Sequence, residues 1–348
     1  MTTLETRMMM KKKPLKTLRA TALAALQAVA WGAALASPAL AADKIAVVVK
    51  SLGNGFFDAV NQGAQEAAKE IKNIEIIYTG PAKSTAEGQI EIINALISQK
   101  VAAIVISAND PDALAPSLKR AMGRGIKVLS FDSGVRKDGR MMHLSPSSNA
   151  LIGEKLVQLT QQAIGDSGEI AVVSSTAQAT NQNIWIEEIR KVLARPAYKG
   201  LKLVSVAYGD DQIDKSYRET QGLFKSYPNL KAIIAPTTIG VAAAAKAVQD
   251  EKKVGSVYVT GLGLPSEMAG HVKNGAVKSF AIWNPIDLGY SSIQAASQLI
   301  AGKFTGKPGD KVSLGRVGSV VLDANSEAAM AEPFTYDASN VEKFAKIF

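Results

Sequence analysis

The chain has 348 residues, of which 47% are hydrophobic and 20% are charged, and its formal net charge is +9. This composition is typical of a chain that buries a large core, so it excludes disordered, collagen-like and low-complexity classes. The sequence contains no cysteine, which excludes disulfide scaffolds, zinc–thiolate sites, iron–sulfur clusters and cysteine nucleophiles. Because only His143 and His271 supply imidazoles, a histidine-rich metal site is not expected.

The first 41 residues have the pattern of a secretory signal peptide. Six basic residues precede an apolar run of roughly 15 residues, and the small-residue sequence Ala39-Leu40-Ala41 follows that run. The run is shorter than the ~20 apolar residues that a membrane span needs, although a retained N-terminal anchor is the alternative. Without a cysteine to carry a lipid, we expect cleavage near Ala41 and a soluble protein exported to the periplasm.

The positive charge is concentrated in this leader. Once it is removed, the remaining chain carries a formal net charge of only +4. Its basic residues are scattered in pairs such as Lys252 and Lys253, and aromatic side chains are not interleaved with them. We therefore expect solvated helix faces there and no nucleic-acid partner.

From Lys44 onward, short β-branched runs alternate with longer helical patterns. The predicted strands are 45–49, 75–78, 103–107, 127–131, 169–175, 202–206, 232–235, 256–260 and 279–283, and the predicted helices include 56–72, 86–99 and 286–301. Because the strands are apolar on both faces, they predict parallel sheets that helices cover on each side. Nearly ten strands indicate two such sheets.

The sequence therefore predicts an α/β protein with two doubly wound parallel-sheet lobes, a multi-strand hinge and a cleft between the lobes. A polar bridge around His143 to Asn149 marks the first crossing. We assign residues 43–146 and about 285–308 to the N-terminal lobe, and 147–284 and about 309–348 to the C-terminal lobe. In open α/β sheets, ligands bind beyond the carboxyl ends of the strands.

The residues that follow the predicted strands form a consistent chemical set. Carboxylates accept hydrogen bonds from hydroxyl groups, and amides both accept and donate them. Aromatic faces cover the CH groups of a ring, so the set fits a neutral polyol. Lys50 and Asp132 are expected to pair, because a buried ammonium needs a partner, whereas Asp112 is assigned to a helix cap. The candidate ligand-binding residues are Lys50, Phe56, Phe57, Asn109, Asp110, Asp132, Asn181, Gln182, Trp185, Pro236, Thr238, Trp283 and Asn284.

Motifs for catalysis and cofactor binding are missing from the sequence. Two G-x-G sequences, at Gly53 and Gly261, follow strands, but neither has the third glycine of a dinucleotide fingerprint. There is no G-x-S-x-G elbow, Walker lysine motif or His-Glu-x-x-His sequence. We therefore expect a binding protein without a cofactor or a metal. The simpler interpretation of Phe56, Phe57 and Trp185 is ordinary core packing.

Several segments resemble the type I periplasmic sugar-binding proteins of ABC transporters. The resemblance covers nearly all of the chain after the leader and is closest to the rhamnose-binding proteins, followed by the autoinducer-2-binding proteins. It rests on Lys50–Phe57 (KSLGNGFF), Tyr78–Pro81 (YTGP), Ile106–Asp112 (ISANDPD), Asn181–Trp185 (NQNIW), Asn284–Tyr290 (NPIDLGY) and Tyr336–Asn340 (YDASN). It implies a monomeric receptor that binds a sugar, most simply L-rhamnose, and delivers it to a permease with its ATPase.

By this resemblance, Lys50, Asp132, Gln182 and Pro236 match ligand-binding positions that are shared with the autoinducer-2 group. Two positions depart from that group. Asn181 replaces an aspartate, and Thr238 replaces a small alanine, which should disfavour autoinducer-2 and suit a deoxy-sugar.

Three alternatives remain. An autoinducer-2 receptor would have the same fold. A sugar-acting enzyme would need two facing carboxylates, and Asp110 with Asp132 is the pair the sequence offers. A sugar-responsive regulator would need a helix-turn-helix head in the place where this chain has its leader.

Overall fold

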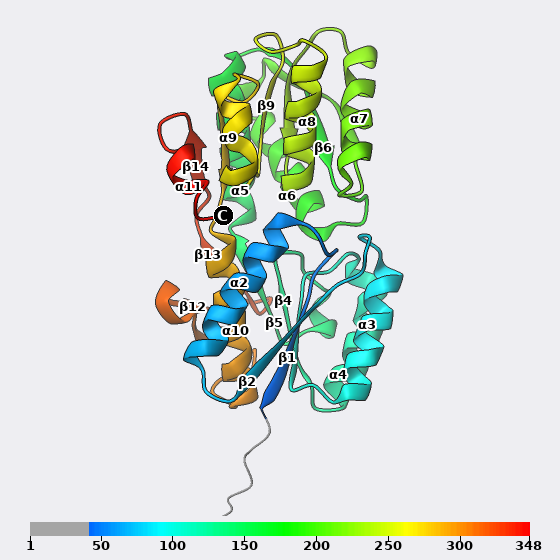
Figure 1. Ribbon diagram of the computed structural model, residues 1–348, viewed down its shortest axis with the longest axis vertical. Coiled ribbons are helices and arrows are strands. Elements are labelled where there is room, and N and C mark those ends of the chain that lie inside the picture. Colours follow the sequence, from blue (N-terminus) through cyan, green and yellow to red (C-terminus); the bar gives the residue numbers. More distant parts are fainter. Residues whose placement is uncertain (1–41) are drawn as a thin grey trace, which may run out of the picture. The chain divides into compact units, whose positions relative to one another are not determined.

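The computed structural model describes residues 42–348, and the predicted signal peptide lies outside the described residues. The described chain forms two parallel β-sheets with helices on both faces of each, which confirms the predicted α/β class (Figure 1). Within these residues, none of the helices has the length and apolar character that a bilayer crossing requires.

The first sheet has six strands in the order β13-β5-β4-β3-β1-β2, and every neighbouring pair is parallel. Its strands are β1 (Asp43–Val48), β2 (Ile74–Thr79), β3 (Ala103–Ile106), β4 (Lys127–Phe131), β5 (Met142–Ser147) and β13 (Glu327–Ala331). The helices of this lobe are α2 (Gly55–Glu70), α3 (Ala86–Gln99), α4 (Pro111–Gly123) and α10 (Pro285–Ile300).

Alternation along β1 explains why both faces of this sheet are covered. Ile45 and Val47 belong to the apolar cluster that includes α2 and α10, while Ala46 and Val48 belong to the cluster formed with α3 and α4. All four are fully or almost fully buried, as expected where successive side chains point to opposite faces.

The second sheet has four parallel strands in the order β7-β6-β8-β9. They are β6 (Gly168–Ser174), β7 (Leu201–Tyr208), β8 (Leu230–Ala235) and β9 (Tyr258–Gly261). A bridge between Leu262 and Ala281 joins β10 (Ser279–Ile282) to its edge, and β10 pairs antiparallel with β14 (Phe334–Asp337). The helices are α5 (Asn149–Ile164), α6 (Thr180–Leu193), α7 (Ile213–Ser226), α8 (Thr238–Asp250), α9 (Pro265–Lys273) and α11 (Val341–Phe344).

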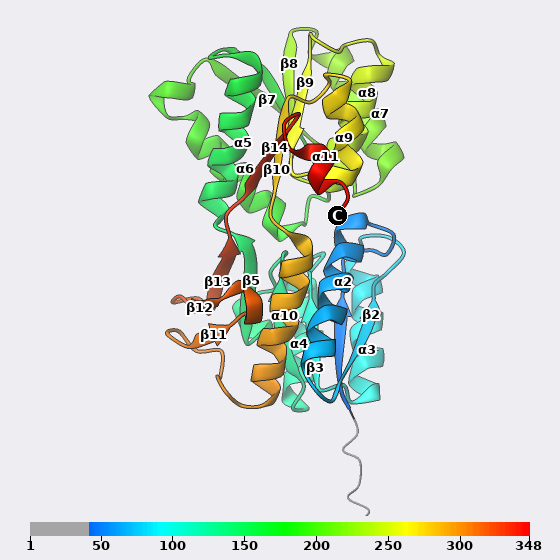
Figure 2. The same cartoon turned by 60° about the vertical axis from the view of Figure 1, so that its left-hand side comes forward.

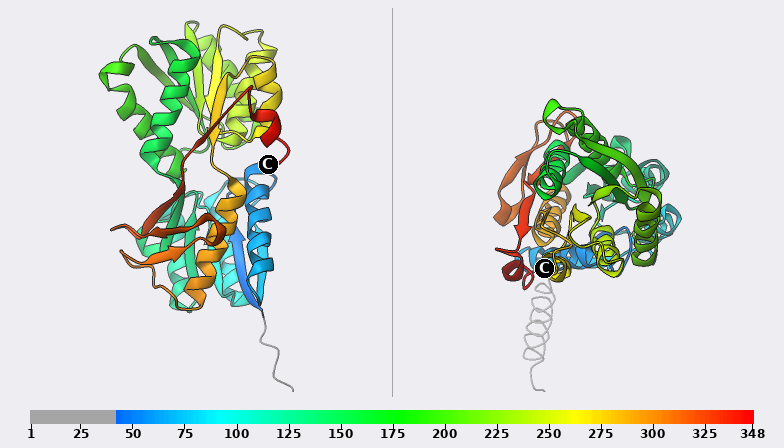
Figure 3. Two further views of the ribbon diagram at one scale, coloured as in Figure 1. Left: turned by 90° about the vertical axis from the view of Figure 1, so that its left-hand side faces the viewer. Right: turned by 90° about the horizontal axis from the view of Figure 1, so that it is seen from above.

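The chain crosses between the lobes three times, after β5, after β10 and after β13. In Figures 2 and 3, β13 and β14 lie on one stretch of chain that leads from the first sheet to the second. This corrects the predicted boundary near residue 308, because residues 309–331 remain with the N-terminal lobe. The hairpin of β11 (Lys311–Ser313) and β12 (Ser319–Val321) follows α10, and β13 extends the first sheet beside β5.

Side chains hold this returning segment in place. The Arg316 guanidinium lies 2.7 Å from Glu66 on α2 and 3.0 Å from Asp287 on α10. No strand is predicted at β13 from the sequence, because Glu-Ala-Ala-Met-Ala has neither β-branched residues nor alternation. Its extended form follows from backbone pairing with β5.

β5 itself was predicted as a polar bridge, and that prediction is wrong. All six of its residues are buried, and it pairs with both β4 and β13. Its His143 contacts the Ser130 hydroxyl at 3.0 Å, and burial together with nearby Arg140 lowers the pKa of His143 to about 3. The imidazole is therefore neutral at physiological pH and acts as a hydrogen-bonding core residue.

Candidate ligand-binding site between the two lobes

A cavity of about 40 Å³ lies where the carboxyl ends of strands from both sheets meet. This volume has room for roughly three water molecules. Hydrogen bonds run across it from one lobe to the other, so the lobes are closed upon each other. Its lining includes ten of the thirteen candidate residues: Lys50, Phe56, Phe57, Asp132, Asn181, Gln182, Trp185, Pro236, Thr238 and Trp283. The strand order of the two sheets thus brings residues as distant in sequence as Lys50 and Trp283 together in one cavity.

The polar centre of this cavity is a bridge from one lobe to the other. The Lys50 ammonium donates to Asn181 Oδ1 at 3.0 Å, and Asn181 Nδ2 donates to Asp132 Oδ1 at 3.0 Å. Lys50 and Asp132 follow strands of the first sheet, whereas Asn181 lies on the first turn of α6 in the second lobe. The expected direct pair of Lys50 and Asp132 is therefore corrected: an amide from the opposite lobe lies between them.

Asp132 is held in position by its backbone and by a neighbouring strand. Its φ of 55° is in the left-handed region, which aspartate tolerates better than most residues. Ser107 Oγ donates to its second carboxylate oxygen at 2.7 Å. Burial raises the pKa of Asp132, and the nearby Lys50 charge and these hydrogen bonds oppose that rise.

Gln182 presents its amide from the second lobe. Its Oε1 accepts hydrogen bonds from Ser174 Oγ and from the backbone N–H of Ser175, both at 2.8 Å. Because both bonds use the carbonyl oxygen, the amide NH₂ group is the part of this side chain available to a ligand.

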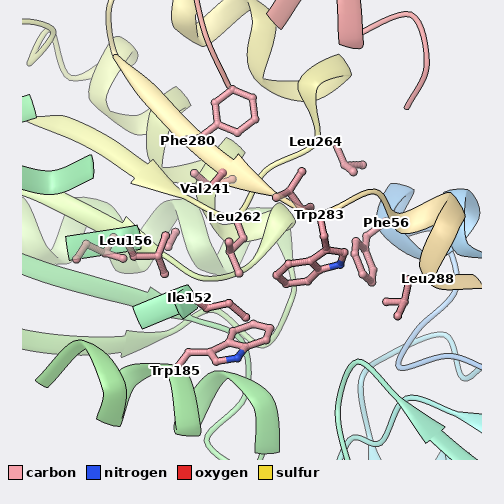
Figure 4. Close-up of a cluster of buried hydrophobic side chains, with 14 of the residues drawn as sticks. Phe56, Ile152, Leu156, Trp185, Val241, Leu262, Leu264, Phe280, Trp283 and Leu288 are labelled. Atoms are coloured by element: carbon pink, nitrogen blue, oxygen red, sulfur yellow. The ribbon is translucent and has the colours of Figure 1, made fainter. Parts of the chain in front are cut away.

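Phe56, Trp185 and Trp283 line one side of the cavity. Figure 4 shows the Trp283 ring between the rings of Phe56 and Trp185. Trp283 lies between Phe56, with ring centroids 6.2 Å apart, and Trp185, with centroids 5.7 Å apart. Trp185 Nε1 donates to Asn149 Oδ1 at 2.8 Å, whereas the buried Trp283 Nε1 has no hydrogen-bond partner within residues 42–348. These rings serve both interpretations, since they are buried core residues and also line the cavity.

Three candidates lie outside the lining and have other roles. Asn109 donates to the backbone carbonyls of Lys50, at 2.9 Å, and Thr85, at 3.1 Å, so it supports the loop that carries Lys50. Asp110 is the N-cap of α4, which corrects the prediction of Asp112 for that role, and Asn284 is the N-cap of α10.

The lining also includes five residues that are not among the sequence-based candidates: Asn54, Asp211, Thr237, Leu262 and Ile282. Asn54 caps α2 and accepts a hydrogen bond from Thr238 Oγ1 of the other lobe at 3.3 Å. Asp211 follows β7, which extends to Tyr208, two residues beyond the predicted strand end. A longer strand assignment would have brought this aspartate into the set of strand-end residues.

The chemistry of this arrangement is that of binding. Asp110 lies outside the cavity lining, so the carboxylate pair proposed for a glycosidase is not assembled there. Among residues 42–348, no group of three or more acidic or histidine side chains is placed to hold a metal ion. Two lobes, three crossings and a polar cavity with an aromatic wall define a two-lobed binding protein.

Comparison with known proteins gives the family. The model of the periplasmic binding protein domain matches residues 45–304, so the chain belongs to the periplasmic binding protein family. The D-ribose/D-allose-binding protein of Pseudomonas aeruginosa is 28% identical over 274 residues, covering 75% of this chain and 83% of that protein. The D-allose-binding periplasmic protein of Escherichia coli is 25% identical over 274 residues, covering 76% of this chain and 86% of that protein.

Two solved structures are informative. An ABC transporter solute-binding protein from Clostridium phytofermentas with bound L-rhamnose is 35% identical with a TM-score of 0.85, covering 88% of this chain and 99% of that one. LsrB from Clostridium saccharobutylicum in complex with AI-2 is 22% identical with a TM-score of 0.81, covering 86% and 99%, and shares the fold. The chain is accordingly a binding protein and not an enzyme.

Proposed function

We propose that this chain is the exported receptor of an ABC sugar importer and that it binds L-rhamnose. The Lys50–Asn181–Asp132 bridge carries this proposal, because it places hydroxyl-binding groups from both lobes in one cavity. The similarity to the L-rhamnose-bound structure at 35% identity supports it. The periplasmic location, the monomeric state and delivery to a permease with its ATPase are parts of the same proposal.

Closure of the lobes follows from the contacts that join them. Lys50 and Asp132 each bond to Asn181, and Asn54 bonds to Thr238, so hydrogen bonds already span the cleft. A sugar hydroxyl that inserts among these groups replaces direct bonds with bonds to the ligand. Binding then favours the closed state through contacts that only that state offers.

Specificity is tested first by calorimetry with L-rhamnose and autoinducer-2. We expect rhamnose to bind and autoinducer-2 to bind weakly or not at all. The reason is that Asn181 and Thr238, which line the cavity, stand where the autoinducer-2 group has an aspartate and an alanine, and so they change its hydrogen-bond acceptors and its shape. A thermal-shift screen of pentoses, hexoses and 6-deoxy-hexoses accompanies it, since a ligand at 100 times its Kd adds about 2.7 kcal/mol to folded-state stability. Tighter binding of autoinducer-2 would contradict the proposal.

The double variant Asn181→Asp with Thr238→Ala tests the same two positions. A carboxylate at position 181 faces Asp132 Oδ1 at about the 3.0 Å of the present amide contact, so the two carboxylates compete for protons and donors. Alanine at position 238 removes the hydroxyl that bonds to Asn54. We expect the ligand preference of the double variant to move toward autoinducer-2. The control, Thr180→Ala, removes a hydroxyl outside the cavity lining. An unchanged preference in the double variant would show that positions 181 and 238 do not determine specificity.

Trp283 should report ligand binding by its fluorescence. In a variant with Trp31→Phe and Trp185→Phe, only Trp283 emits, and we expect the added sugar to shift its spectrum because the ring lines the cavity. The control, Trp185→Phe with Trp283→Phe, has no tryptophan once the leader is removed, and it gives the background emission. Identical spectra with and without saturating sugar in the first variant would remove Trp283 from the binding wall.

A further inference from the structure

Asp211 lies in the cavity but belongs to no motif that the sequence offered. It sits in the loop between β7 and α7, and its φ of 50° is left-handed. Thr237 Oγ1 donates to its carboxylate at 2.6 Å. Both residues line the cavity, so the second lobe places a carboxylate in the site just as the first lobe does with Asp132.

The formal charges in this site do not balance. The charged residues that line the cavity are Lys50, Asp132 and Asp211. The Lys50 ammonium acts on both carboxylates, yet its hydrogen bond goes to the neutral Asn181. The closed site therefore contains two carboxylates and one ammonium, and an uncompensated negative charge is costly where the groups are buried away from bulk water.

The neighbouring charges do not remove this excess. Asp210, next to Asp211 in the loop, forms its own ion pair with Lys215 on α7 at 2.6 Å. The negative charge of Asp210 acts to raise the pKa of Asp211, and the hydroxyl of Thr237 acts to lower it. A neutral sugar contributes hydroxyl groups but no positive charge, so a proton is the remaining way to balance the site.

We propose that closure on a neutral sugar takes up a proton that Asp132 and Asp211 share, with Asp211 as a ligand-contacting residue that creates this linkage. The inference rests on the proposed function of the same site. The proton comes from the buffer and is released again when the lobes open and the sugar leaves. The two carboxylates then act as one acceptor and one donor toward sugar hydroxyls.

The direction of the pH dependence follows from burial. In the closed structure, burial raises the pKa of both carboxyls despite the opposing Lys50 charge. When the lobes separate, Asp211 regains water and loses the Lys50 ammonium of the other lobe. Affinity is then highest below the open-state pKa and falls as pH rises toward the closed-state pKa, by at most about tenfold per pH unit for one proton.

A second group must be separated from this effect. A Cβ on Gly55 of the first lobe would lie 2.9 Å from Glu267 Oε1 of the second, and burial raises the pKa of Glu267 to about 7. Glu267 can therefore also take up a proton on closure. For this reason, the test compares Glu267→Gln, Glu267→Gln with Asp211→Asn, and Glu267→Gln with Asp210→Asn.

Calorimetry with L-rhamnose in phosphate and in Tris at the same pH measures the proton count, because the two buffers differ in ionisation enthalpy. We expect Glu267→Gln to take up a proton, in an amount up to one per sugar, and to lose affinity as pH rises. Asp211→Asn in this background should abolish both effects. Asp210→Asn should keep the proton uptake and move the fall in affinity only toward lower pH, because its charge acts to raise the pKa of Asp211. It is a matched control because Asp210 shares the left-handed φ, at 54°.

The outcomes separate the inference from the proposed function. Sugar binding without proton uptake in Glu267→Gln overturns the inference and leaves the proposed function standing. Equal proton uptake with and without Asp211 also overturns it. An absence of heat with L-rhamnose contradicts the proposed function and the inference that rests on it. The Glu267→Gln measurement needs no change at Asp211, so a folding failure of that variant does not remove the test.

Discussion

Replacing Asp132 with alanine should weaken sugar binding by about thirty-fold to several thousand-fold, which corresponds to the ~2 to 5 kcal/mol lost when one partner of a buried charged hydrogen bond is removed. The change removes the acceptor for Ser107 and Asn181 and leaves the Lys50 ammonium with a less favourable environment. It thereby loosens the bridge that joins the lobes. Calorimetry at constant pH measures the effect.

The matched control for this variant is Asp138→Ala. Asp138 lies on the same lobe, and its exposed carboxylate pairs with Arg136 and Lys119 at the surface. Asp138 lies outside the cavity lining, and exposed ion pairs contribute little, so this variant should bind sugar like the wild type. Equal affinities for the Asp132 and Asp138 variants would exclude Asp132 from the site.

Gly63→Ala should destabilise the protein by about 3 kcal/mol or more, at the upper end of overpacking effects. Gly63 lies where α2 crosses α10, and an added Cβ would be 1.8 Å from the Ile286 carbonyl oxygen. The contact is reciprocal, because a Cβ on Gly289 would be 1.9 Å from the Val60 carbonyl oxygen. Neither backbone can yield without separating the helices, so we expect a lower midpoint in urea unfolding.

Gly222→Ala is the control for the glycine effect. Gly222 lies within α7, and a Cβ there has no other atom within 4 Å. Alanine in such a helical position should stabilise the protein by about 0.4 to 1 kcal/mol. Equal stability of the Gly63→Ala and Gly222→Ala variants would show that the α2–α10 contact tolerates an added Cβ. Because α2 begins beside Phe56 and α10 follows Trp283, the Gly63 variant should also disturb the aromatic wall.

The first strand shows how much of this fold is local. Ile45 to Val49 is apolar at every position, and such a run is stable only where both faces are covered, so the parallel sheet with helices on each side follows from the sequence. The same logic placed Lys50 and Asp132 at strand ends. Strand ends and the turns that follow them therefore predict ten of the residues that line the cavity.

Two of the candidates that lie outside the cavity lining are helix caps. Asp110 and Asn284 also follow strands, but each precedes a helix that begins with proline. Their side chains accept hydrogen bonds from the free backbone N–H groups of the first turn. Sequence position alone does not distinguish a cap from a ligand contact. The orientation of the side chain decides between them.

The sequence by itself determined the alternating α/β pattern, the two sheets and most of the residues that could meet a ligand, because these depend on periodicity and on strand ends. Only the tertiary structure decided that β5 and β13 are strands, since His143 and the alanines of β13 become extended through backbone pairing with distant partners. It also decided that Asn181 lies between Lys50 and Asp132 and that Asp211 lines the same cavity. The physical reason is that these contacts span the two lobes, and their distances depend on closure, which no local pattern encodes.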